Sequence, residues 1–445
     1  MPQFLTQRYN STVSLIMAIF WLGLYILVNL TSILYLGALA VSAISGIGFM
    51  TCMWGLAIFA IIITIGGMKV IGFTDVIQVL FLIIGGLATT YLAVNLVSDP
   101  NNSLADSFTG LINGYKEMTA NHSDHFHMIL NKGQMMYPNS KGEMQDAYME
   151  LPGLVVLFGA MWIVNLNYWG CNQYITQRAL GAELKTARHG ILFAAFLKLL
   201  MPVIVTLPGI AAYALYQKGM FQSEMTVNGQ LVADKAYPVL LSLLPAGLKG
   251  LSFAALTAAI VASLAGKANS ISTIFTLDIF KKYLGKDKSE AQLVGIGRIV
   301  IVVSMIMAIL ISPLMGIDKE GGFQFVQQMT GLLSPGIFAA FIMGFFWKRT
   351  NSAGALFAIV GGFLIAFAMY KNVFPGADWT QVPFINRMGI VFLICVAVMI
   401  VLGFVLPDEK KGLEIDTSMF KVDKIFAIGA SVVLAILVAL YAYFW

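Results

Sequence analysis

The sequence predicts an all-α, polytopic membrane protein, and three observations carry that prediction. Hydrophobic residues make up 59% of the 445-residue chain, whereas charged residues make up only 11%. The mean hydropathy is +0.83, which is typical of a chain whose helices face lipid. Eleven apolar stretches also reach the length of about 20 residues that a helix needs to cross a bilayer. We therefore treat residues 1–445 as one transmembrane domain.

The apolar stretches and the charges between them predict how the chain crosses the membrane. Lys and Arg concentrate in alternate loops, including 276–298 and 406–424, and such loops face the cytoplasm. The N-terminus is then cytoplasmic and the C-terminus extracytoplasmic, and the one long hydrophilic stretch, 99–151, is an extracytoplasmic loop. The predicted spans are 13–36, 49–65, 76–97, 154–169, 190–215, 251–275, 299–315, 325–346, 353–370, 388–405 and 425–445.

The sixth stretch is unusually polar for a membrane helix. Residues 252–280 combine small side chains with a series of hydroxyl, amide and ammonium groups. In hydrocarbon these groups must face other helices, a cavity or an ion. Two interpretations stay open at this point: a tightly packed helix seam held by hydroxyls, or a pathway for a solute or cation. The polar residues are Thr257, Ser263, Lys267, Asn269, Ser270, Ser272 and Thr273.

Prolines predict interruptions in two other spans. Pro202 and Pro208 lie within the fifth span, and Pro335 lies within the eighth. Each proline lacks a backbone donor and leaves a carbonyl that lipid cannot satisfy. Broken helices of this kind build the binding sites of many transporters, although a simple kink is the alternative.

A few polar side chains beside these interruptions are candidates for binding a solute. Lys198 lies inside the fifth span, where an ammonium needs a cavity or a polar partner unless it reaches the interface. Amides and aromatic rings gather at 165–174, a set that suits either a sugar or an interfacial aromatic belt. Phe323 and Gln327 open the eighth span. Asp75 stands at the mouth of the third span and either caps that helix or lines a cation exit route.

Other classes of chemistry have no candidate site. The sequence contains no nucleophile–base pair, phosphate-binding glycine loop or metal-ligand set, so we predict neither an enzyme nor a bound cofactor. The net charge of +5 is distributed between loops and indicates no nucleic-acid partner. Cys52, Cys171 and Cys395 are predicted to be buried, unpaired side chains. The histidines of 122–127 fit a solvated loop better than a metal site.

At these positions the sequence resembles the sodium/solute symporter family, and most closely its bacterial sodium/galactose (sodium/glucose) branch. The resemblance covers nearly the whole chain, and the matching runs occur in the family's order. They include NLNYWG at 165–170 and FAAFLK at 193–198, together with 66–68, 74–78, 172–174, 177–178, 253–256, 269–270, 276–278, 330–331 and 334–336. The resemblance implies a LeuT-like inverted repeat, a bacterial inner membrane location, and sugar, sodium and membrane lipid as partners.

The resemblance also assigns roles to individual residues. Asn165, Lys198 and Gln327 match positions that hydrogen-bond a sugar. Tyr168 matches the ring that closes the inner side of the sugar pocket, and Phe323 matches part of an outer lid. The resemblance thus implies that the polar and aromatic residues beside the helix interruptions bind a sugar.

For the coupling ion, the resemblance points to the polar sixth stretch. Ala259 matches a backbone-carbonyl ligand for sodium and Ser263 a hydroxyl ligand, in a helix region expected to have freed carbonyls. Ala262 stands where the family commonly has a second hydroxyl. Lys267 lies one turn beyond Ser263, where its ammonium either repels sodium or takes its place.

The start of the chain resembles the cytoplasmic loop after the family's third helix. About three upstream helices are therefore predicted to be absent, and weak or no sodium-dependent uptake is expected of a chain that starts at Met1. Two alternatives to a sodium-coupled sugar symporter stay open. One is a degenerate, non-transporting sensor or scaffold, and the other is a symporter for an inositol, a carboxylate or an amino acid. The oligomeric state is not predicted.

Overall fold

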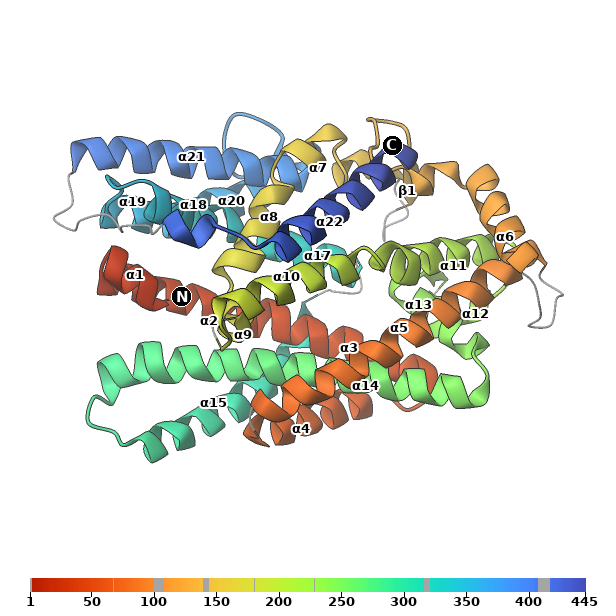
Figure 1. Cartoon of the computed structure of the whole chain (residues 1–445), viewed down its shortest axis with the longest axis horizontal. Coiled ribbons are helices and arrows are strands. Elements are labelled where there is room, and N and C mark those ends of the chain that lie inside the picture. The colour runs from red at the N-terminus through yellow and green to blue at the C-terminus, as the bar shows by residue number, and fades with distance from the viewer. Residues whose placement is uncertain are drawn as a thin grey trace.

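The computed structural model describes residues 2–66, 68–99, 108–138, 144–179, 181–227, 229–315, 321–406 and 417–445. Ten helices in this part of the chain are long and apolar enough to cross a membrane. The number becomes eleven when α17 (Gly322–Gly331) and α18 (Ser334–Phe346) count as one bent span. The long helices lie side by side in a bundle (Figure 1). The predicted helical membrane protein with about eleven spans is confirmed.

The first three spans come from the N-terminal third. Behind the short helix α1 (Pro2–Arg8), the first span joins α2 (Ser11–Gly23), the π-helical η1 (Leu24–Leu30) and α3 (Thr31–Ser45). α2 begins where the Asn10 side chain accepts the N–H of Val13, and α3 ends at Gly46 with φ of 73°. The second and third spans are α4 (Phe49–Gly66) and α5 (Met68–Ser98).

Asp75 lies inside α5, because this helix already includes Met68. The alternative that Asp75 caps the N-terminus of the third span is therefore wrong. Hydropathy marks where the apolar part of the helix begins, and the first turns of α5 are too polar to show in it. A role for Asp75 in a cation exit route stays a prediction.

The hydrophilic region between α5 and α7 has regular structure of its own. It contains α6 (Phe108–Asn121), the 3-10 turns η2 (Ser123–Phe126) and η3 (Ala147–Met149), and the antiparallel strands β1 (Met136–Pro138) and β2 (Met144–Asp146). These elements lie in the predicted hydrophilic connection 99–151 between the third and fourth spans, of which 100–107 and 139–143 lie outside the described residues. That this connection is extracytoplasmic stays a prediction. His122 and His125 are half-buried, and their rings contact the ring of Tyr213.

The fourth and fifth spans are interrupted. The fourth joins α7 (Leu154–Phe158), α8 (Met161–Leu166), the π-helical η4 (Asn167–Cys171) and α9 (Gln173–Ala179). The fifth joins α10 (Leu184–Lys198), the π-helical η5 (Pro202–Thr206) and α11 (Leu207–Gln217). A change of helix type at Pro202 and a bend of 49° between α17 and α18, just before Pro335, confirm the predicted interruptions.

The polar sixth stretch forms the longest helical run of the bundle. The sixth stretch corresponds to α14 (Ala246–Thr273). The short elements that precede it are α12 (Gln222–Met225), strands β3 (Thr226–Val227) and β4 (Gln230–Leu231), η6 (Ala233–Lys235), α13 (Ala236–Leu240) and η7 (Leu241–Leu243). α14 continues into the π-helical η8 (Ile274–Leu284) and packs against α3, α4, α5 and α15 (Glu290–Ile311). η9 (Ser312–Leu314) follows α15.

Region 276–298 is mostly helical, so the predicted loop there is wrong in its extent. η8 runs to Leu284, and the Ser289 side chain already caps α15 through a capping box with Gln292. Hydropathy predicts where a helix leaves the bilayer, not where it ends, and both helices extend past their apolar parts. That this region faces the cytoplasm stays a prediction.

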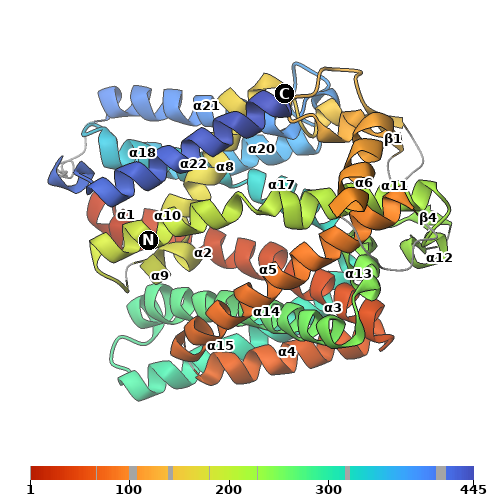
Figure 2. The ribbon, with the colours of Figure 1, turned by 45° about the vertical axis from the view of Figure 1, so that its right-hand side comes forward.

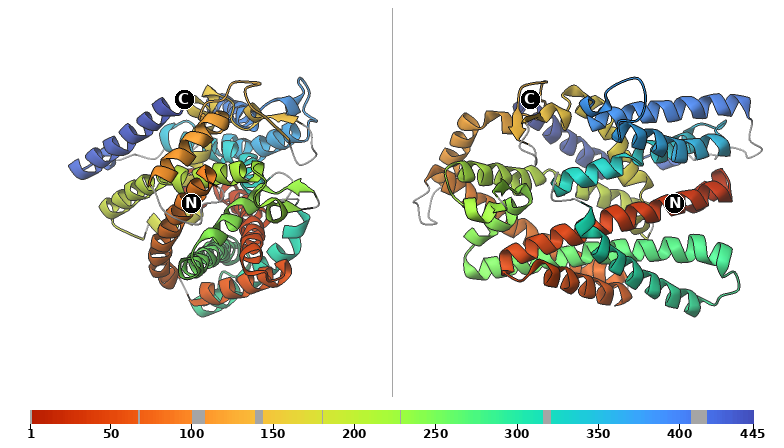
Figure 3. Two further views of the ribbon diagram at one scale, coloured as in Figure 1. Left: turned by 90° about the vertical axis from the view of Figure 1, so that its right-hand side faces the viewer. Right: turned by 180° about the vertical axis from the view of Figure 1, so that it is seen from behind.

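The last spans form the far side of the bundle. They comprise α19 (Ser352–Leu356), η10 (Phe357–Gly361), α20 (Gly362–Tyr370), η11 (Trp379–Gln381), α21 (Phe384–Val405), η12 (Thr417–Phe420) and α22 (Lys424–Tyr443). Most of the predicted loop 406–424 lies outside the described residues. α22 has no buried residue and lies against α10 at the edge of the bundle (Figures 2 and 3). Cys52, Cys171 and Cys395 are buried and unpaired, as predicted.

A buried arginine fastens the N-terminal segment to α18. Arg8 is 1% exposed, and its Nε donates to the carbonyl of Gly344 at 3.0 Å. Its Nη2 donates to the carbonyls of Trp347, Lys348 and Thr350 at 3.1, 3.2 and 3.0 Å. These carbonyls belong to the end of α18 and the turn after it, so the guanidinium supplies the donors that the helix end lacks.

Arg8→Ala should lower the free energy of unfolding in mild detergent by at least about 3 kcal/mol, because it leaves buried carbonyls without donors. The free energy of unfolding of Arg8→Lys should lie between those of the wild type and Arg8→Ala, because one ammonium cannot make all the hydrogen bonds of the planar guanidinium. Denaturant unfolding followed by tryptophan fluorescence measures both. An Arg8→Ala chain as stable as the wild type would contradict this role.

Candidate functional site

The five residues predicted to bind sugar lie on four segments that border the helix interruptions. Asn165 lies in the last turn of α8, Tyr168 lies in η4, Lys198 ends α10, and Phe323 and Gln327 lie on α17. Gln327 is half-buried, whereas the other four are exposed, Phe323 to 75%. The side chains are thus positioned at breaks in the helices, and their surfaces are open.

Lys198 and the η4 segment come together in the structure. The Nζ atom of Lys198 lies 5.1 Å from the centre of the Trp169 ring, and that ring meets the Tyr168 ring edge-on at 5.8 Å. A cation over an aromatic face is an attractive arrangement. Lys198 of the fifth span therefore contacts the group of aromatic residues, Tyr168 and Trp169, in the fourth span.

A second contact links the fourth span to the bend in the eighth. Asn167 is 4% exposed, and its Nδ2 donates to Ser334 Oγ at 3.2 Å. Ser334 Oγ in turn donates to the carbonyl of Thr330 at 2.9 Å. The sequence does not predict this contact: Ser334 directly precedes the predicted break at Pro335, whereas the η4 interruption that contains Asn167 was not predicted. Together they join the segment with Tyr168 to the helix with Gln327.

Two cavities of the described structure lie away from these five residues. One lies between α17, α20 and α21 and is lined by residues including Gln328, Ala366 and Arg387. The other, of about 140 Å³, lies between α5, α6 and α11, where Lys218 Nζ meets Glu117 Oε1 at 2.6 Å. Neither is lined by a predicted sugar-binding residue, so sugar binding at those five residues stays a prediction.

The residues predicted to bind sodium lie on an unbroken helix. α14 is α-helical from Ala246 to Thr273, so the carbonyl of Ala259 is not freed by a break, contrary to the expectation from the sequence. Ser263 is half-buried, and its hydroxyl makes no hydrogen bond within the described part of the chain. A carbonyl with a second lone pair and an available hydroxyl, one turn apart, suit a hard monovalent cation. Ala262 is buried and offers no oxygen beyond its backbone.

The hydroxyls further along α14 serve a different purpose. Ser270 donates to the carbonyl of Gly266 at 3.1 Å and accepts from Gln177 of α9 at 2.9 Å. Ser272 donates to the carbonyl of Gly297 in α15 at 2.9 Å, and Thr273 to that of Asn269. For this half of the stretch, the interpretation as a helix seam held by hydroxyls is correct.

Lys267 lies between the two halves of α14, in an aromatic clamp. It is 5% exposed, and its Nζ lies 4.6 Å from the ring centre of Tyr25 in η1 and 4.4 Å from that of Tyr174 in α9. Asn172 fixes both tyrosines, since its Oδ1 accepts from Tyr25 Oη at 2.5 Å and from the N–H of Tyr174 at 3.0 Å. The clamp therefore connects α14 to the end of η4.

A carboxylate outside the spans holds the first turn of α17. Asp234 in η6 accepts the N–H of Gly322 through Oδ2 at 2.9 Å. Burial raises the pKa of the Asp234 carboxyl, and this hydrogen bond opposes the rise. α17 has no capping side chain of its own, so Asp234 acts as its cap from a distant segment. The next residue on α17 is Phe323, the predicted outer lid.

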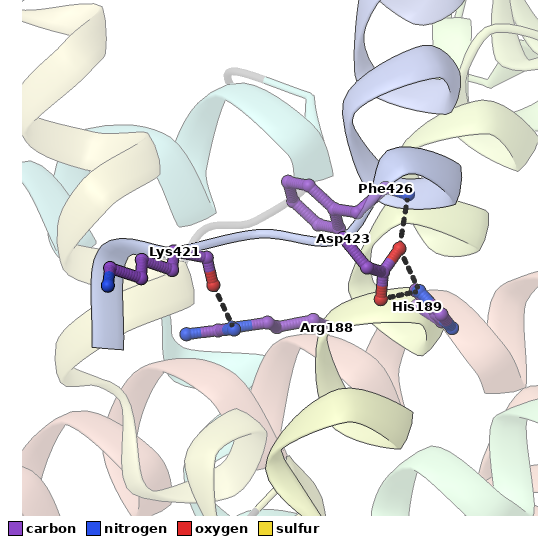
Figure 4. Close-up of polar contacts among 5 residues, drawn as sticks. All are labelled: Arg188, His189, Lys421, Asp423 and Phe426. Carbon is purple, nitrogen blue, oxygen red and sulfur yellow. Dashed lines mark hydrogen bonds and ion pairs between the residues drawn. The ribbon is translucent and has the colours of Figure 1, made fainter. Parts of the chain in front are cut away.

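The far end of α10 is tied to α22 by polar contacts (Figure 4). His189 Nε2 lies 2.9 Å from Asp423 Oδ2, and Asp423 Oδ1 accepts the N–H of Phe426 at 2.9 Å. That N–H and the neighbouring His189 hold the pKa of Asp423 below its usual range. Arg188 donates to the carbonyls of Lys421 and Met419. α10 is thus held at one end by these contacts, with Lys198 at the other.

Interrupted spans with polar side chains at their breaks define a multi-pass membrane protein of the secondary-transporter class. Comparison with known proteins narrows that class. The family model for the sodium:solute symporter family matches residues 1–362, so the chain belongs to that family, which comprises transporters and not enzymes. The predicted resemblance is confirmed.

Individual relatives agree with the family. A sodium/glucose cotransporter of Vibrio parahaemolyticus is 42% identical over 458 aligned residues, which cover 100% of this chain and 79% of the relative. A human sodium/myo-inositol cotransporter 2 is 31% identical over 82% of this chain and 54% of its own length. A solved structure of a Na⁺-coupled sialic acid symporter, in a substrate-bound, outward-open state, matches 92% of this chain and 78% of its own with a TM-score of 0.71. At 21% identity that likeness shows the fold, which is LeuT-like.

Asp234→Ala should speed amide hydrogen exchange in the first turn of α17 about fivefold, the equivalent of about 1 kcal/mol for a lost helix cap. Asp234→Asn should exchange like the wild type, because an amide oxygen still accepts the N–H of Gly322. Exchange measured by mass spectrometry over peptides that contain 321–331 tests both. Equal exchange in the wild type and Asp234→Ala would rule out the cap.

Proposed function

We propose that this chain carries out sodium-coupled secondary active symport of a galactose- or glucose-like sugar by alternating access. The observation that carries the proposal is the meeting of Lys198 with Trp169, next to Tyr168, where η4 interrupts the fourth span. A charged donor beside aromatic rings at a helix break suits a sugar, whose hydroxyls take hydrogen bonds and whose apolar face stacks on rings. The Vibrio relative's description as a sodium/glucose cotransporter supports the same substrate class.

Five side chains would share the binding of the sugar. Asn165, Lys198 and Gln327 would hydrogen-bond its hydroxyls, Tyr168 would close the inner side of the pocket, and Phe323 would form part of the outer lid. The contact between Asn167 and Ser334 supports this assignment, because it holds the segment with Tyr168 against the helix with Gln327.

The coupling ion would be held on α14 by the carbonyl of Ala259 and the hydroxyl of Ser263. Sodium and sugar would then raise each other's affinity by the same factor. The excess of Lys and Arg in alternate loops supports a cytoplasmic N-terminus and an extracytoplasmic C-terminus. Similarity to the Vibrio cotransporter supports a location in a bacterial inner membrane. Asp75 would line the route by which sodium leaves.

Gln327→Ala should raise the half-saturating galactose concentration at least fivefold, roughly the value of one hydrogen bond to an uncharged group. Gln328→Ala is the matched control, because Gln328 is the next amide on α17 and lines the cavity against α20 and α21. The measurement is uptake of labelled galactose into proteoliposomes with a sodium or a choline gradient. Equilibrium binding of galactose is measured in parallel, so that binding and transport are assessed separately.

The same assay separates the alternatives. If myo-inositol or sialic acid inhibited the uptake of labelled galactose more strongly than unlabelled galactose or glucose did, the substrate would belong to another class than these sugars. Galactose binding without flux, and without any effect of sodium, would favour the sensor or scaffold. Equal galactose affinity in the wild type and Gln327→Ala would remove Gln327 from the site.

A further inference from the structure

Lys267 places a fixed positive charge in the last two turns of α14, the helix that carries the candidate sodium ligands. Its ammonium is buried, and the rings of Tyr25 and Tyr174 lie at 4.6 and 4.4 Å from Nζ. Aromatic faces stabilise a cation without removing its charge, since only the ring quadrupoles respond to it. An ionisable side chain inside a membrane span is costly and is retained for a function in most proteins.

The position of Lys267 relative to Ser263 makes its charge relevant to sodium. The two residues are four apart on an unbroken α-helix, so they share one face and their Cβ atoms lie about 6 Å apart. A sodium ion at the Ser263 hydroxyl would therefore lie on the same face of α14 as the Lys267 ammonium, and two cations repel each other more strongly where the dielectric constant is low. Ala262, which is 5% exposed, adds no second hydroxyl to offset the repulsion.

The clamp prevents the ammonium from simply moving away. Tyr25 and Tyr174 are both bonded to Asn172 Oδ1, and Tyr174 also donates its N–H to Tyr25 Oη at 3.3 Å. Gln177 bonds to Ser270 three residues further along α14, so α9 and α14 are also fastened to each other next to the clamp. The charge is held in one place by three different segments.

We propose that Lys267 sets the sodium affinity of this chain, by repelling sodium from the Ser263 face of α14. The inference rests on the proposed sodium-coupled function and adds a residue that determines how much sodium the protein needs. Removing the charge should lower the sodium concentration required for half-maximal binding about tenfold, because an ammonium one helical turn away contributes a repulsion of that order.

Lys267→Met tests this directly, because methionine fills a similar volume without charge. Lys267→Arg keeps the charge and the stacking on both rings and should bind sodium like the wild type. Lys249→Met is the matched control, since it removes the same charge from α14 at about 21 Å along the helix from Ser263, beyond the screening length of physiological salt. Lys267→Gln provides a second uncharged variant if methionine disturbs folding.

The measurement is sodium-dependent thermal stabilisation of the full chain in detergent, with choline chloride keeping the ionic strength constant. The half-maximal sodium concentration should fall about tenfold in Lys267→Met and Lys267→Gln and stay unchanged in the other two variants. An equal value in the wild type and both uncharged variants, including no sodium effect in any of them, would overturn the inference, as would an equal shift in Lys249→Met.

Transport measurements separate this inference from the proposed function. Sodium-driven galactose uptake with the same sodium requirement in the wild type and Lys267→Met would overturn the role of Lys267 and leave symport intact. Uptake that ignores sodium in both chains would overturn both. Uptake that gains sodium dependence only in Lys267→Met would support the inference in its strongest form.

Discussion

The rest of the bundle depends on one constraint, which is that the polar groups of α14 cannot stay unsatisfied in lipid. α14 packs against α3, α4, α5 and α15, so it lies where most neighbours can reach it. The end of α14 that continues into η8 meets the constraint by bonding to neighbouring helices: Ser272 to α15 and Ser270 to α9. The half that contains Ser263 does not, because the Ser263 hydroxyl makes no hydrogen bond in the described residues. A single helix is therefore a packing element at one end and a candidate binding surface at the other, with Lys267 between them.

The interruptions in the other spans are stabilised by amide side chains rather than left loose. Asn172 follows η4 directly and bonds to Tyr25 in the first span, while Asn167 within η4 bonds to Ser334 at the start of α18. A π-helical segment or a proline bend leaves backbone groups and side chains in irregular positions, and buried amides can both donate and accept there. The breaks of three spans are thus joined through η4. Four of the five predicted sugar-binding residues lie on or next to the segments that these contacts hold, and Lys198 of α10 reaches the same region through Trp169.

Hydropathy alone predicted the number of spans, because a helix that crosses lipid must be apolar over a fixed length. The same signal could not locate the helix ends: α5 extends upstream of Asp75, and η8 and α15 fill most of the predicted loop 276–298. Proline positions predicted the breaks at Pro202 and Pro335, since proline acts locally on its own helix. The pairings of Asn167 with Ser334 and of Lys267 with Tyr25 could not be predicted in this way. They join residues from distant spans, and nothing in the local sequence of either partner specifies the other.

The contacts around Lys267 also provide a physical route between the two candidate sites. The ammonium connects α14 to Tyr174 and Tyr25, Asn172 holds both tyrosines, and Asn172 directly follows the η4 segment that contains Tyr168. Any displacement of α14 relative to α9 must therefore either break the clamp or move the end of η4 with it. Coupling between two ligands requires an element whose position both of them bias. The clamp is such an element, because one side of it belongs to the helix of Ser263 and the other to the corner where Lys198 meets Trp169. The side chain that weakens sodium binding in our proposal, Lys267, would then also link the binding of sodium to the position of η4 in the candidate sugar site.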